Sequence, residues 1–476
     1  MPLRTWSAIR HRVTATGAGA CSFDERFGTM TVIPLSGLLA IESDHTVCFD
    51  RQDREIAWPE FVQTVGGLAA RLSESKSRFW AINTSNSFEY GCALFACWSA
   101  GKTPVLAPEH MLTSGKHGLE FDGVIGSVEA ISKPVISFDH LEQLDPAVSI
   151  IPSMSELVLF TSGSTGQPTQ VQRSILNIEA ELDVLESLWG ETIGDARVYS
   201  TVSHRHVYGM LFRLLWPLVT QRAFAMFNFE YPENLLGAVS TGGALVTSPA
   251  LLKRTGHLED PTETPWRAIF SSGGMLPAYA AKDATRLLGV CPTEVLGSTE
   301  TSGVAWRQQV QDGSDELWHS MPEVRVRQDE EGFLEVSSPF MGLSNWHRMG
   351  DKVRLETNRS FELLGRGDHI VKIEEKRVSL AEIEQRAIEL SSIVDAAAVA
   401  LEDGARQYVG LVVQLSESGG VELNEQGNKQ VNAAIRQSLR SKLEPVAVPK
   451  KFRFVDAIPV NAQGKRQPQI LQRLFT

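Results

Sequence analysis

The residues best suited to chemistry form a stretch rich in glycine and hydroxyl side chains, FTSGSTGQPTQVQRS, from Phe160 to Ser174. It overlaps the end of the strand-like run ELVLF. A Gly/Ser/Thr loop after a buried strand can turn several backbone N–H groups and hydroxyls toward one point and bind phosphate oxygens. A solvated linker has the same composition, so the stretch alone leaves both interpretations open. A P-loop is excluded because GxxxxGK[ST] requires a lysine that is absent here.

Further motifs follow in order along the chain. They are SHRHVYG (Ser203 to Gly209), SSGGMLP (Ser271 to Pro277), GSTE (Gly297 to Glu300), MGD (Met349 to Asp351), GRGDHIVK (Gly365 to Lys372) and NAQGK (Asn461 to Lys465). With TSGSTGQP, this ordered set resembles the adenylate-forming acyl and aryl ligases, AMP-binding enzymes that activate a carboxylic acid with ATP. The resemblance runs from about Leu35 to the end of the chain.

The resemblance implies a role for each motif. Asp351 binds the ribose with Arg366 beside it, Thr299 touches the α-phosphate, and Glu300 helps hold Mg²⁺. Lys465 is the catalytic lysine, and Asp368 is the hinge. Phosphate and adenine contacts fall on Thr161, Ser162, Gly163, Ser164, Thr165, Gly166, Gly273, Gly274, Leu296 and Gly297. The pocket aromatic is His206, and the remaining acid-pocket residues are Val207, Tyr208, Gly209 and Met275.

The chemistry fits these residue types. Attack of a carboxylate on the α-phosphorus of ATP brings two anions together, so catalysis needs charge neutralisation and alignment more than a general base. Lys465 and a Mg²⁺ held by Glu300 supply positive charge. Taken singly, Glu300 or Asp351 is more often a surface carboxylate, and Lys465 a solvated tail charge. Their joint order favours the functional interpretation.

Three positions depart from the family pattern. The loop ends Pro168-Thr169-Gln170 instead of Pro-Lys-Gly, so a positive contact near the γ-phosphate is missing. Leu296 replaces the aromatic that stacks on adenine. Glu375 stands where relatives commonly carry a glycine that lets the pantetheine arm pass, which leaves the route of the thiol acceptor open.

The elements that must position these motifs follow an α/β rhythm. From about Leu35 to Pro339 short β-rich runs alternate with helical ones, as in FWAINTS, FEYGCALFACWSAG and TPVLAP, which predicts crossover units and parallel sheets. After Asp368 the pattern changes to a charged helix, SLAEIEQRAIELSS, two strands around Asp403-Gly404, and a helix VNAAIRQSLRSKL. We therefore expect a large N-terminal domain, 1–368, with a flexible arm in 1–30, and a small rotating α+β domain, 369–476.

Composition excludes several classes of protein. Lys plus Arg total 45 against 57 Asp plus Glu in 476 residues, so a net charge of −12 repels a phosphate backbone and argues against nucleic acid as a partner. The five cysteines have no metal-ligand spacing, which indicates reduced core residues in a cytoplasmic protein. The apolar stretches YGCALFACWSAG and VYGMLFRLLWPLV are too short to span a bilayer, and Arg213 interrupts the second.

Within the superfamily, SHRHVYGMLFRLLWPL and VKIEEKRVSLAEIE most resemble the ligases of aryl polyene and xanthomonadin-type pigment biosynthesis. That narrower resemblance implies a small aromatic acid such as 4-hydroxybenzoate and an acyl carrier protein or coenzyme A as acceptor. Two alternatives stay open. One is a fatty or short-chain acyl ligase with the same chemistry, and the other is a catalytically silent AMP-binding protein, suggested by Thr169 and Glu375.

Overall fold

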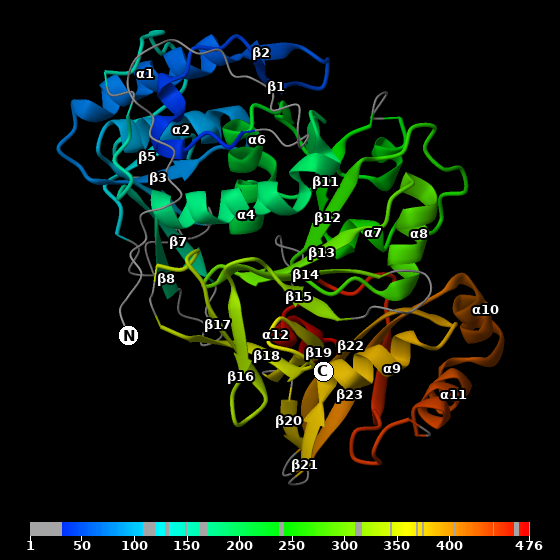
Figure 1. Cartoon of the computed structure of the whole chain (residues 1–476). Helices are drawn as coiled ribbons and strands as arrows, with labels where there is room; N and C mark the ends of the chain where they lie inside the picture. The colour runs from blue at the N-terminus through cyan, green and yellow to red at the C-terminus, as the bar shows by residue number, and fades with distance from the viewer. Residues whose placement is uncertain are drawn as a thin grey trace.

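The computed structural model describes residues 31–107, 112, 120–128, 133–147, 150–161, 169–237, 242–309, 317–342, 345–367, 370–373, 376–403, 406–440, 442–460 and 466–475. In Figure 1 the elements up to β19 (Ser360–Arg366) form the larger part of the molecule. The orange and red elements, from β22 (Ile393–Asp403) onward, lie together in its lower part.

A six-stranded sheet has the order β6, β5, β3, β4, β7, β8. Its neighbours are parallel except β7 and β8, which are antiparallel. Strands β4 and β5 are buried throughout, as expected for parallel strands covered on both faces. The bounds are β3 (Phe79–Asn83), β4 (Thr103–Leu106), β5 (Gly123–Gly126), β6 (Val135–Ile136), β7 (Glu156–Thr161) and β8 (Thr169–Ser174).

A second sheet has thirteen strands, and one part of it is parallel. Strands β1, β10, β9, β11, β12 and β13 pair in parallel in that order, and β2 pairs antiparallel to β1 at the edge. The bounds are β1 (Thr46–Phe49), β2 (Glu55–Ala57), β9 (Val198–Ser200), β10 (Phe224–Ala225), β11 (Ala244–Thr247), β12 (Ala268–Ser272) and β13 (Thr293–Ser298).

The same sheet continues from β13 as an antiparallel part in the order β14, β15, β19, β18, β17, β16. The bounds are β14 (Ser302–Gln308), β15 (Trp318–Ser320), β16 (Arg325–Gln328), β17 (Phe333–Ser337) and β18 (His347–Leu355).

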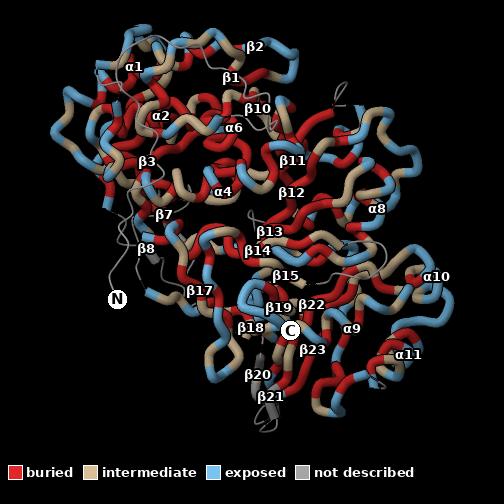
Figure 2. The backbone as a smooth tube through the Cα atoms, in the orientation of Figure 1, coloured by how far each residue is buried: buried red, intermediate tan, exposed pale blue. Residues whose placement is uncertain are grey.

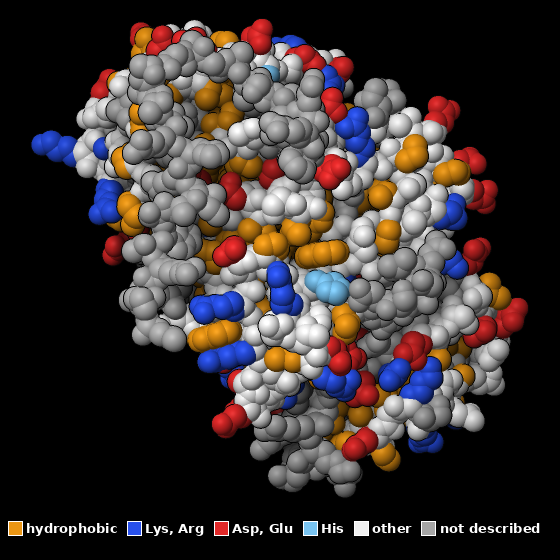
Figure 3. Space-filling view, viewed as in Figure 1, with side chains coloured by type: hydrophobic (Ala, Val, Ile, Leu, Met, Phe, Trp, Pro, Cys, Tyr) orange, Lys and Arg blue, Asp and Glu red, His pale blue; other side chains and the backbone are white. Residues whose placement is uncertain are grey.

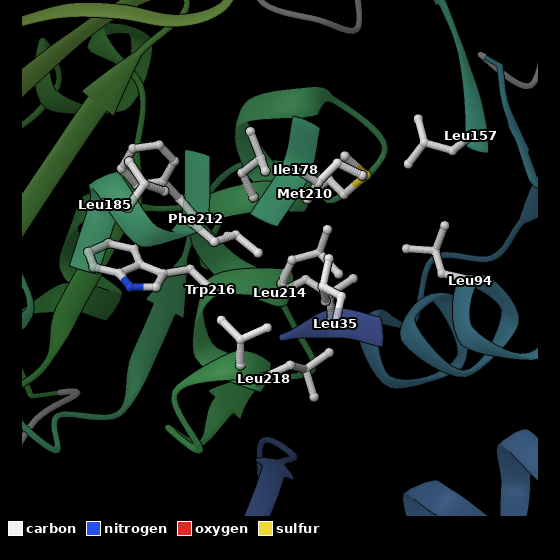
Figure 4. Packing of buried hydrophobic residues seen from close by; sticks show 14 of the residues in the cluster. Leu35, Leu94, Leu157, Ile178, Leu185, Met210, Phe212, Leu214, Trp216 and Leu218 are labelled. Atoms are coloured by element: carbon white, nitrogen blue, oxygen red, sulfur yellow. The ribbon is translucent and has the colours of Figure 1, made fainter. Parts of the chain in front are cut away.

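The largest core joins the two sheets through the helices. Figure 4 shows Leu94, Leu157 and Ile178 pointing toward the aliphatic and aromatic side chains around Phe212 and Trp216. Figure 2 shows the corresponding buried trace through the centre of the larger part. The helices are η1 (Leu35–Ala40), α1 (Trp58–Ser73), α2 (Ser87–Ser99), α4 (Ile175–Ile193), α5 (Val207–Gly209), the π-helix η2 (Met210–Leu215), α6 (Trp216–Val219), η3 (Pro232–Leu235), α7 (Pro249–Leu252) and α8 (Ala278–Leu288).

Over its described residues the C-terminal unit has a hairpin, a three-stranded sheet and the helices α9 to α12. Helices α9 and α11 pack on a core that contains Ile383, Val409 and Ile435 and is separate from the large core. The bounds are β20 (Ile370–Ile373), β21 (Lys376–Ser379), α9 (Leu380–Ile388), β23 (Arg406–Leu415), α10 (Glu417–Gln426), α11 (Asn428–Arg440), β24 (Lys451–Phe454) and α12 (Pro468–Arg473).

Among the described residues, polar contacts join this unit to the larger part at Tyr279 and Lys253. The hydroxyl of Tyr279 on α8 donates to the carbonyl of Val394 at 3.1 Å. Lys253, which follows α7, forms an ion pair with Asp395 at 3.3 Å. Both partners lie near the start of β22, so one small patch links the two parts there.

The predicted α/β fold is confirmed, and so are its strands and helices around residues 79–106 and the two strands before and after the Asp403-Gly404 turn, which pair antiparallel as β22 and β23. Gly404 itself lies outside the described residues. The expected flexible arm, 1–30, and the expected boundary at Asp368 lie outside the described residues. Cys48, Cys92 and Cys97 are buried free thiols, as expected of core residues. None of the described helices has the length and apolar character needed to cross a membrane.

Candidate functional site

Four parallel strands of the large sheet end at one edge, and the predicted motifs follow these ends. Val246 on β11 is in register with Ser200 on β9 and with Phe270 on β12, and Ser272 is in register with Val295 on β13. The segments that carry His206, Gly273 and Thr299 therefore leave the sheet at the same edge. Ligands of open α/β sheets bind at such carboxyl edges.

The predicted phosphate loop connects an antiparallel pair of strands. Thr161, the last residue of β7, pairs with Thr169, the first of β8. The apolar run that precedes the loop is a buried strand, as expected, with Leu157, Val158 and Leu159 nearly inaccessible. Ser162, Gly163, Ser164, Thr165 and Gly166 lie outside the described residues.

Strand β8 reaches the Thr299–Glu300 turn through Arg173. The buried guanidinium Nη2 of Arg173 donates to the carbonyl of Thr299 at 2.8 Å and to the carbonyl of Glu300 at 2.5 Å. Burial lowers the pKa of Arg173, and the carboxylates of Glu181 and Glu300 oppose that shift. The phosphate-loop strand and the GSTE turn are thus in direct contact.

The far side of the turn is held by hydroxyls and by helix α4. The Ser298 hydroxyl accepts from the amide of Thr301, and Ser302 has a φ of 58°. Glu181 on α4 accepts from the amide of Gly303 at 2.8 Å. Burial raises the pKa of Glu181, opposed mainly by that amide. The turn is fixed from both ends by groups outside the motif.

The glycine turn after β12 is held from beneath by a buried ion pair. Glu294 accepts from the amide of Leu276 at 2.9 Å and from Arg307 Nε at 2.8 Å. Gly273 has a φ of 92°, a conformation that glycine adopts without strain. Gly273, Gly274 and Met275 are exposed above this support. Leu296 is half-buried against the large core, and Gly297 is exposed.

The two histidines of SHRHVYG have different surroundings. His204 is buried, and its Nε2 lies 3.0 Å from the carbonyl of Thr84 while its Nδ1 lies 3.0 Å from the Ser87 hydroxyl. Arg213 donates to the same hydroxyl at 2.6 Å. Burial, with a smaller effect from Arg213, lowers the pKa of His204 to about 3. His204 is therefore neutral and structural, and His206 is exposed at the start of α5.

Tyr208, one of the predicted acid-pocket residues after His206, packs against a cluster of buried aromatic rings. The Tyr208 and Phe212 rings are 4.8 Å apart between centroids, and Phe212 also contacts Trp216 and Phe270. Burial raises the pKa of Tyr208. Gly209 is buried, and a Cβ there would meet the carbonyl oxygen of Ser203 at 2.1 Å, so only glycine fits. Val207 is half-buried.

The predicted ribose residues face each other on neighbouring strands. Asp351 on β18 is in register with Arg366 on β19. Asp351 is buried and Arg366 is exposed. A Cβ on Gly350 would meet Arg366 Nη2 at 2.7 Å, so this glycine gives the guanidinium room beside Asp351.

The predicted catalytic lysine and hinge are not described, but their neighbours are. Lys465, Asp368 and Glu375 lie outside the described residues. Arg466, directly after Lys465, contacts Asp395 at 2.5 Å and Glu384 at 3.3 Å. A Cβ on Gly367 would meet the Phe333 ring at 2.0 Å, so Phe333 packs tightly beside the predicted hinge.

A Mg²⁺ site built on one carboxylate fits the described residues. They contain no group of three or more His, Cys, Asp or Glu side chains that could hold a metal ion by themselves. Glu300, half-buried on its braced turn, offers a single carboxylate. Mg²⁺ is usually held by one or two carboxylates together with substrate phosphates, and this donor set fits that pattern.

Comparison with known protein families assigns the chain to a family. Residues 125–332 match the model of the AMP-binding enzyme family, and residues 382–465 match the model of the AMP-binding enzyme C-terminal domain. The chain belongs to the adenylate-forming superfamily. The two AMP-binding models include every predicted site residue from Thr161 to Glu300, as well as Lys465.

Sequences of curated relatives match this chain over most of its length. It is 23% identical over 347 residues to 4-hydroxybutyrate–CoA ligase 1 of Metallosphaera sedula, covering 64% of this chain and 60% of the relative, which is less than two thirds of its length. It is 23% identical over 421 residues to benzoate–CoA ligase of Thauera aromatica, covering 77% and 72%. The ATP-bound MatB of Rhodopseudomonas palustris has the same fold, with a TM-score of 0.77, 19% identity and coverage of 92% and 99%.

Three functional-site neighbours carry no signal in the sequence motifs. Arg173 lies in the Phe160–Ser174 stretch, which the sequence leaves as a loop or linker and which the structure ends with strand β8. Glu181 and Glu294 are charged residues within segments that otherwise predict a helix or strand. Each is buried and holds backbone of a predicted motif. Their one local sign is a charge inside an otherwise regular strand or helix, which does not reveal the carbonyl or amide it contacts.

The buried state of His204 predicts a pH-dependent stability. Its pKa is about 3 in the folded protein and about 6.5 in an unfolded chain, so the unfolded state binds an extra proton in this interval. The free energy of unfolding should fall as pH drops below about 6.5, by up to about 1.4 kcal/mol per pH unit from this group. Urea denaturation at pH 4–7 should show a shallower fall for His204→Gln.

His206→Gln, in the same motif but exposed, is the matched control for removing a histidine from this segment. Equal pH slopes for the parent and His204→Gln would contradict a neutral, buried His204.

Proposed function

We propose that the chain activates a carboxylic acid with ATP to an acyl-adenylate and then transfers the acyl group to a phosphopantetheine thiol. The observation that carries the proposal is the contact of Arg173 with the Thr299–Glu300 turn. It brings the strand after the phosphate loop against the predicted α-phosphate and metal residues at one sheet edge. Membership of the AMP-binding family supports the same reaction.

The adenylation step requires alignment of two anions. Donors of Thr161 to Gly166 hold the β- and γ-phosphates, and Thr299 contacts the α-phosphate. Asp351 accepts from the ribose hydroxyls, and Arg366 lies beside it. Lys465 places its charge at the α-phosphate, where negative charge develops as pyrophosphate leaves. When bound at Glu300, Mg²⁺ supplies further neutralisation of the phosphates.

The substrate in this proposal is a small aromatic acid such as 4-hydroxybenzoate. His206, Val207, Tyr208, Gly209 and Met275 line the acid pocket. Tyr208 is half-buried and packs on the buried Phe212 ring, so it offers a rigid apolar face that suits a flat ring. The relative named benzoate–CoA ligase supports an aryl acid, and the relative named 4-hydroxybutyrate–CoA ligase favours the short-chain alternative.

The second half-reaction requires the C-terminal unit, 369–476, to turn about Asp368. Gly365, with a φ of 105°, and Gly367 directly precede this hinge and tolerate the dihedral changes. The link formed by Tyr279, Lys253 and the start of β22 must open in that movement. The acceptor is coenzyme A or an acyl carrier protein. After the rotation, Glu375 lies beside the path by which the phosphopantetheine thiol enters.

A screen of acid-dependent pyrophosphate exchange into ATP tests the proposal. With Mg²⁺, benzoate and 4-hydroxybenzoate should support exchange more than about tenfold better than butyrate or decanoate, a difference of about 1.4 kcal/mol in barrier. Lys465→Ala should abolish exchange and leave the thermal midpoint unchanged. Lys451→Ala, an exposed lysine on β24, is the matched control.

Preference for aliphatic acids would replace the aryl assignment with the acyl alternative. Absence of exchange with every acid, in a folded protein that binds AMP, would leave the silent AMP-binding alternative.

The ribose assignment predicts a defect in nucleotide binding. Asp351→Ala should weaken ATP and AMP binding by roughly 2–3 kcal/mol, the scale of hydrogen bonds to a charged group. Calorimetry measures both affinities. Asp329→Ala, on the neighbouring β16–β17 turn, should leave them unchanged. Unaltered affinity in Asp351→Ala would remove this residue from the site.

A further inference from the structure

We propose that Arg173 and Glu181 are positioning residues that brace the Thr299–Glu300 turn from β8 and α4 and so hold it in the geometry the reaction needs. This inference rests on the proposed function for the turn's role. Neither residue belongs to one of the ordered motifs, and both are buried.

Arg173 acts through two consecutive carbonyls. Its Nη2 donates to Thr299 and Glu300 at 2.8 and 2.5 Å, and its Nη1 donates to its own strand at the carbonyl of Gln172 at 3.2 Å. One planar guanidinium therefore ties the turn to β8. The fixed fork of donors is specific to arginine, because a lysine ammonium presents a point charge on a flexible stem.

Because Arg173 fixes the Thr299 carbonyl, it also fixes the N–H group of the same peptide on the opposite side of the turn. In a trans peptide the C=O and N–H groups point in opposite directions. The Thr299 carbonyl faces Arg173, so the following N–H, that of Glu300, is directed away from the guanidinium. In the proposed reaction an N–H directed this way is a pre-aligned donor for an anion, and pre-aligned donors are where catalytic electrostatics gain most.

Glu181 fixes the other end of the turn. It accepts the Gly303 amide at 2.8 Å, and a Cβ on Gly303 would meet its Oε1 at 2.9 Å. Ser302, between the turn and Gly303, has a left-handed φ of 58°, which costs free energy and persists only where surrounding contacts impose it. The contact of Glu181 with Gly303 is one that imposes it.

Helix α4 offers a matched pair for comparison. Glu186, five residues after Glu181, forms a buried bidentate pair with Arg222 at 2.6 and 2.9 Å. Arg222 also donates to the carbonyl of Gly194 at 2.6 Å. Both sets consist of a buried arginine and a buried glutamate on α4, but Arg222 and Glu186 contact each other and hold a connection away from the Thr299–Glu300 turn.

The experiment compares Arg173→Met/Glu181→Gln with Arg222→Met/Glu186→Gln in the full chain. The first variant removes both charges together, which avoids leaving one unpaired in the interior. It also weakens the Glu181 contact, because a neutral amide oxygen accepts a weaker hydrogen bond from the Gly303 amide than a carboxylate does. Deuterium exchange of the amides in residues 298–303 should rise at least about tenfold in the first variant only. Arg173→Lys should lie between this variant and the parent.

Kinetics separate positioning from folding. In acid-dependent pyrophosphate exchange, kcat should fall at least about tenfold in Arg173→Met/Glu181→Gln, while the KM for ATP changes less than about threefold. The Mg²⁺ concentration for half-maximal exchange should rise. The control variant should have a lower thermal midpoint than the parent, but the same kcat, the same KM for ATP and the same Mg²⁺ concentration for half-maximal exchange.

Two results would overturn the inference. One is equal deuterium exchange of residues 298–303 in the two double variants, and the other is parent-like kcat in Arg173→Met/Glu181→Gln. If the parent itself shows no exchange of pyrophosphate with any acid, the proposed function fails, and deuterium exchange still decides whether Arg173 and Glu181 brace the turn.

Discussion

Buried guanidinium groups hold the backbone carbonyls of the loops from which the site is built. Arg173 binds the Thr299–Glu300 turn, and Arg213 binds the carbonyls of Val202, Ala225 and Phe227 beneath the SHRHVYG segment. Loops at the ends of parallel strands leave carbonyls without ladder partners, and a buried orphan carbonyl is costly. An arginine satisfies several carbonyls at once and fixes their directions. The exposed sides of these loops then carry the chemistry on a rigid base.

The sheet decides where those loops meet. Strands β9, β11, β12 and β13 are in parallel register, so segments more than ninety residues apart in sequence leave the sheet at one edge. Acidic and basic side chains are interspersed on the face seen in Figure 3. The C-terminal unit contacts this part through Tyr279 on α8 and through Lys253, which directly follows α7.

Much of this was predictable from local sequence. Strands β7 and β4 were predictable from the apolar runs ELVLF and TPVLAP, and helix α9 from the charged segment after Ser379. Periodicity and strand propensity are local properties of the sequence. Motif order predicted the family. The bracing by Arg173, Glu181 and Glu294 was not predictable, because each contact joins residues distant in sequence and depends on strand order. That His204 is buried and His206 exposed was not predictable either, because both are histidines of one motif and their burial depends on tertiary packing.

A crystal structure of the chain with a non-hydrolysable aryl-adenylate analogue tests the central claim most directly. The account predicts adenine beside Gly273 and Gly274, ribose hydroxyls on Asp351, and the phosphate-mimicking group at the Thr299–Glu300 turn with Arg173 still bound to both carbonyls. An analogue seated away from the carboxyl edge of β11, β12 and β13, or a turn that leaves Arg173 on binding, would contradict it.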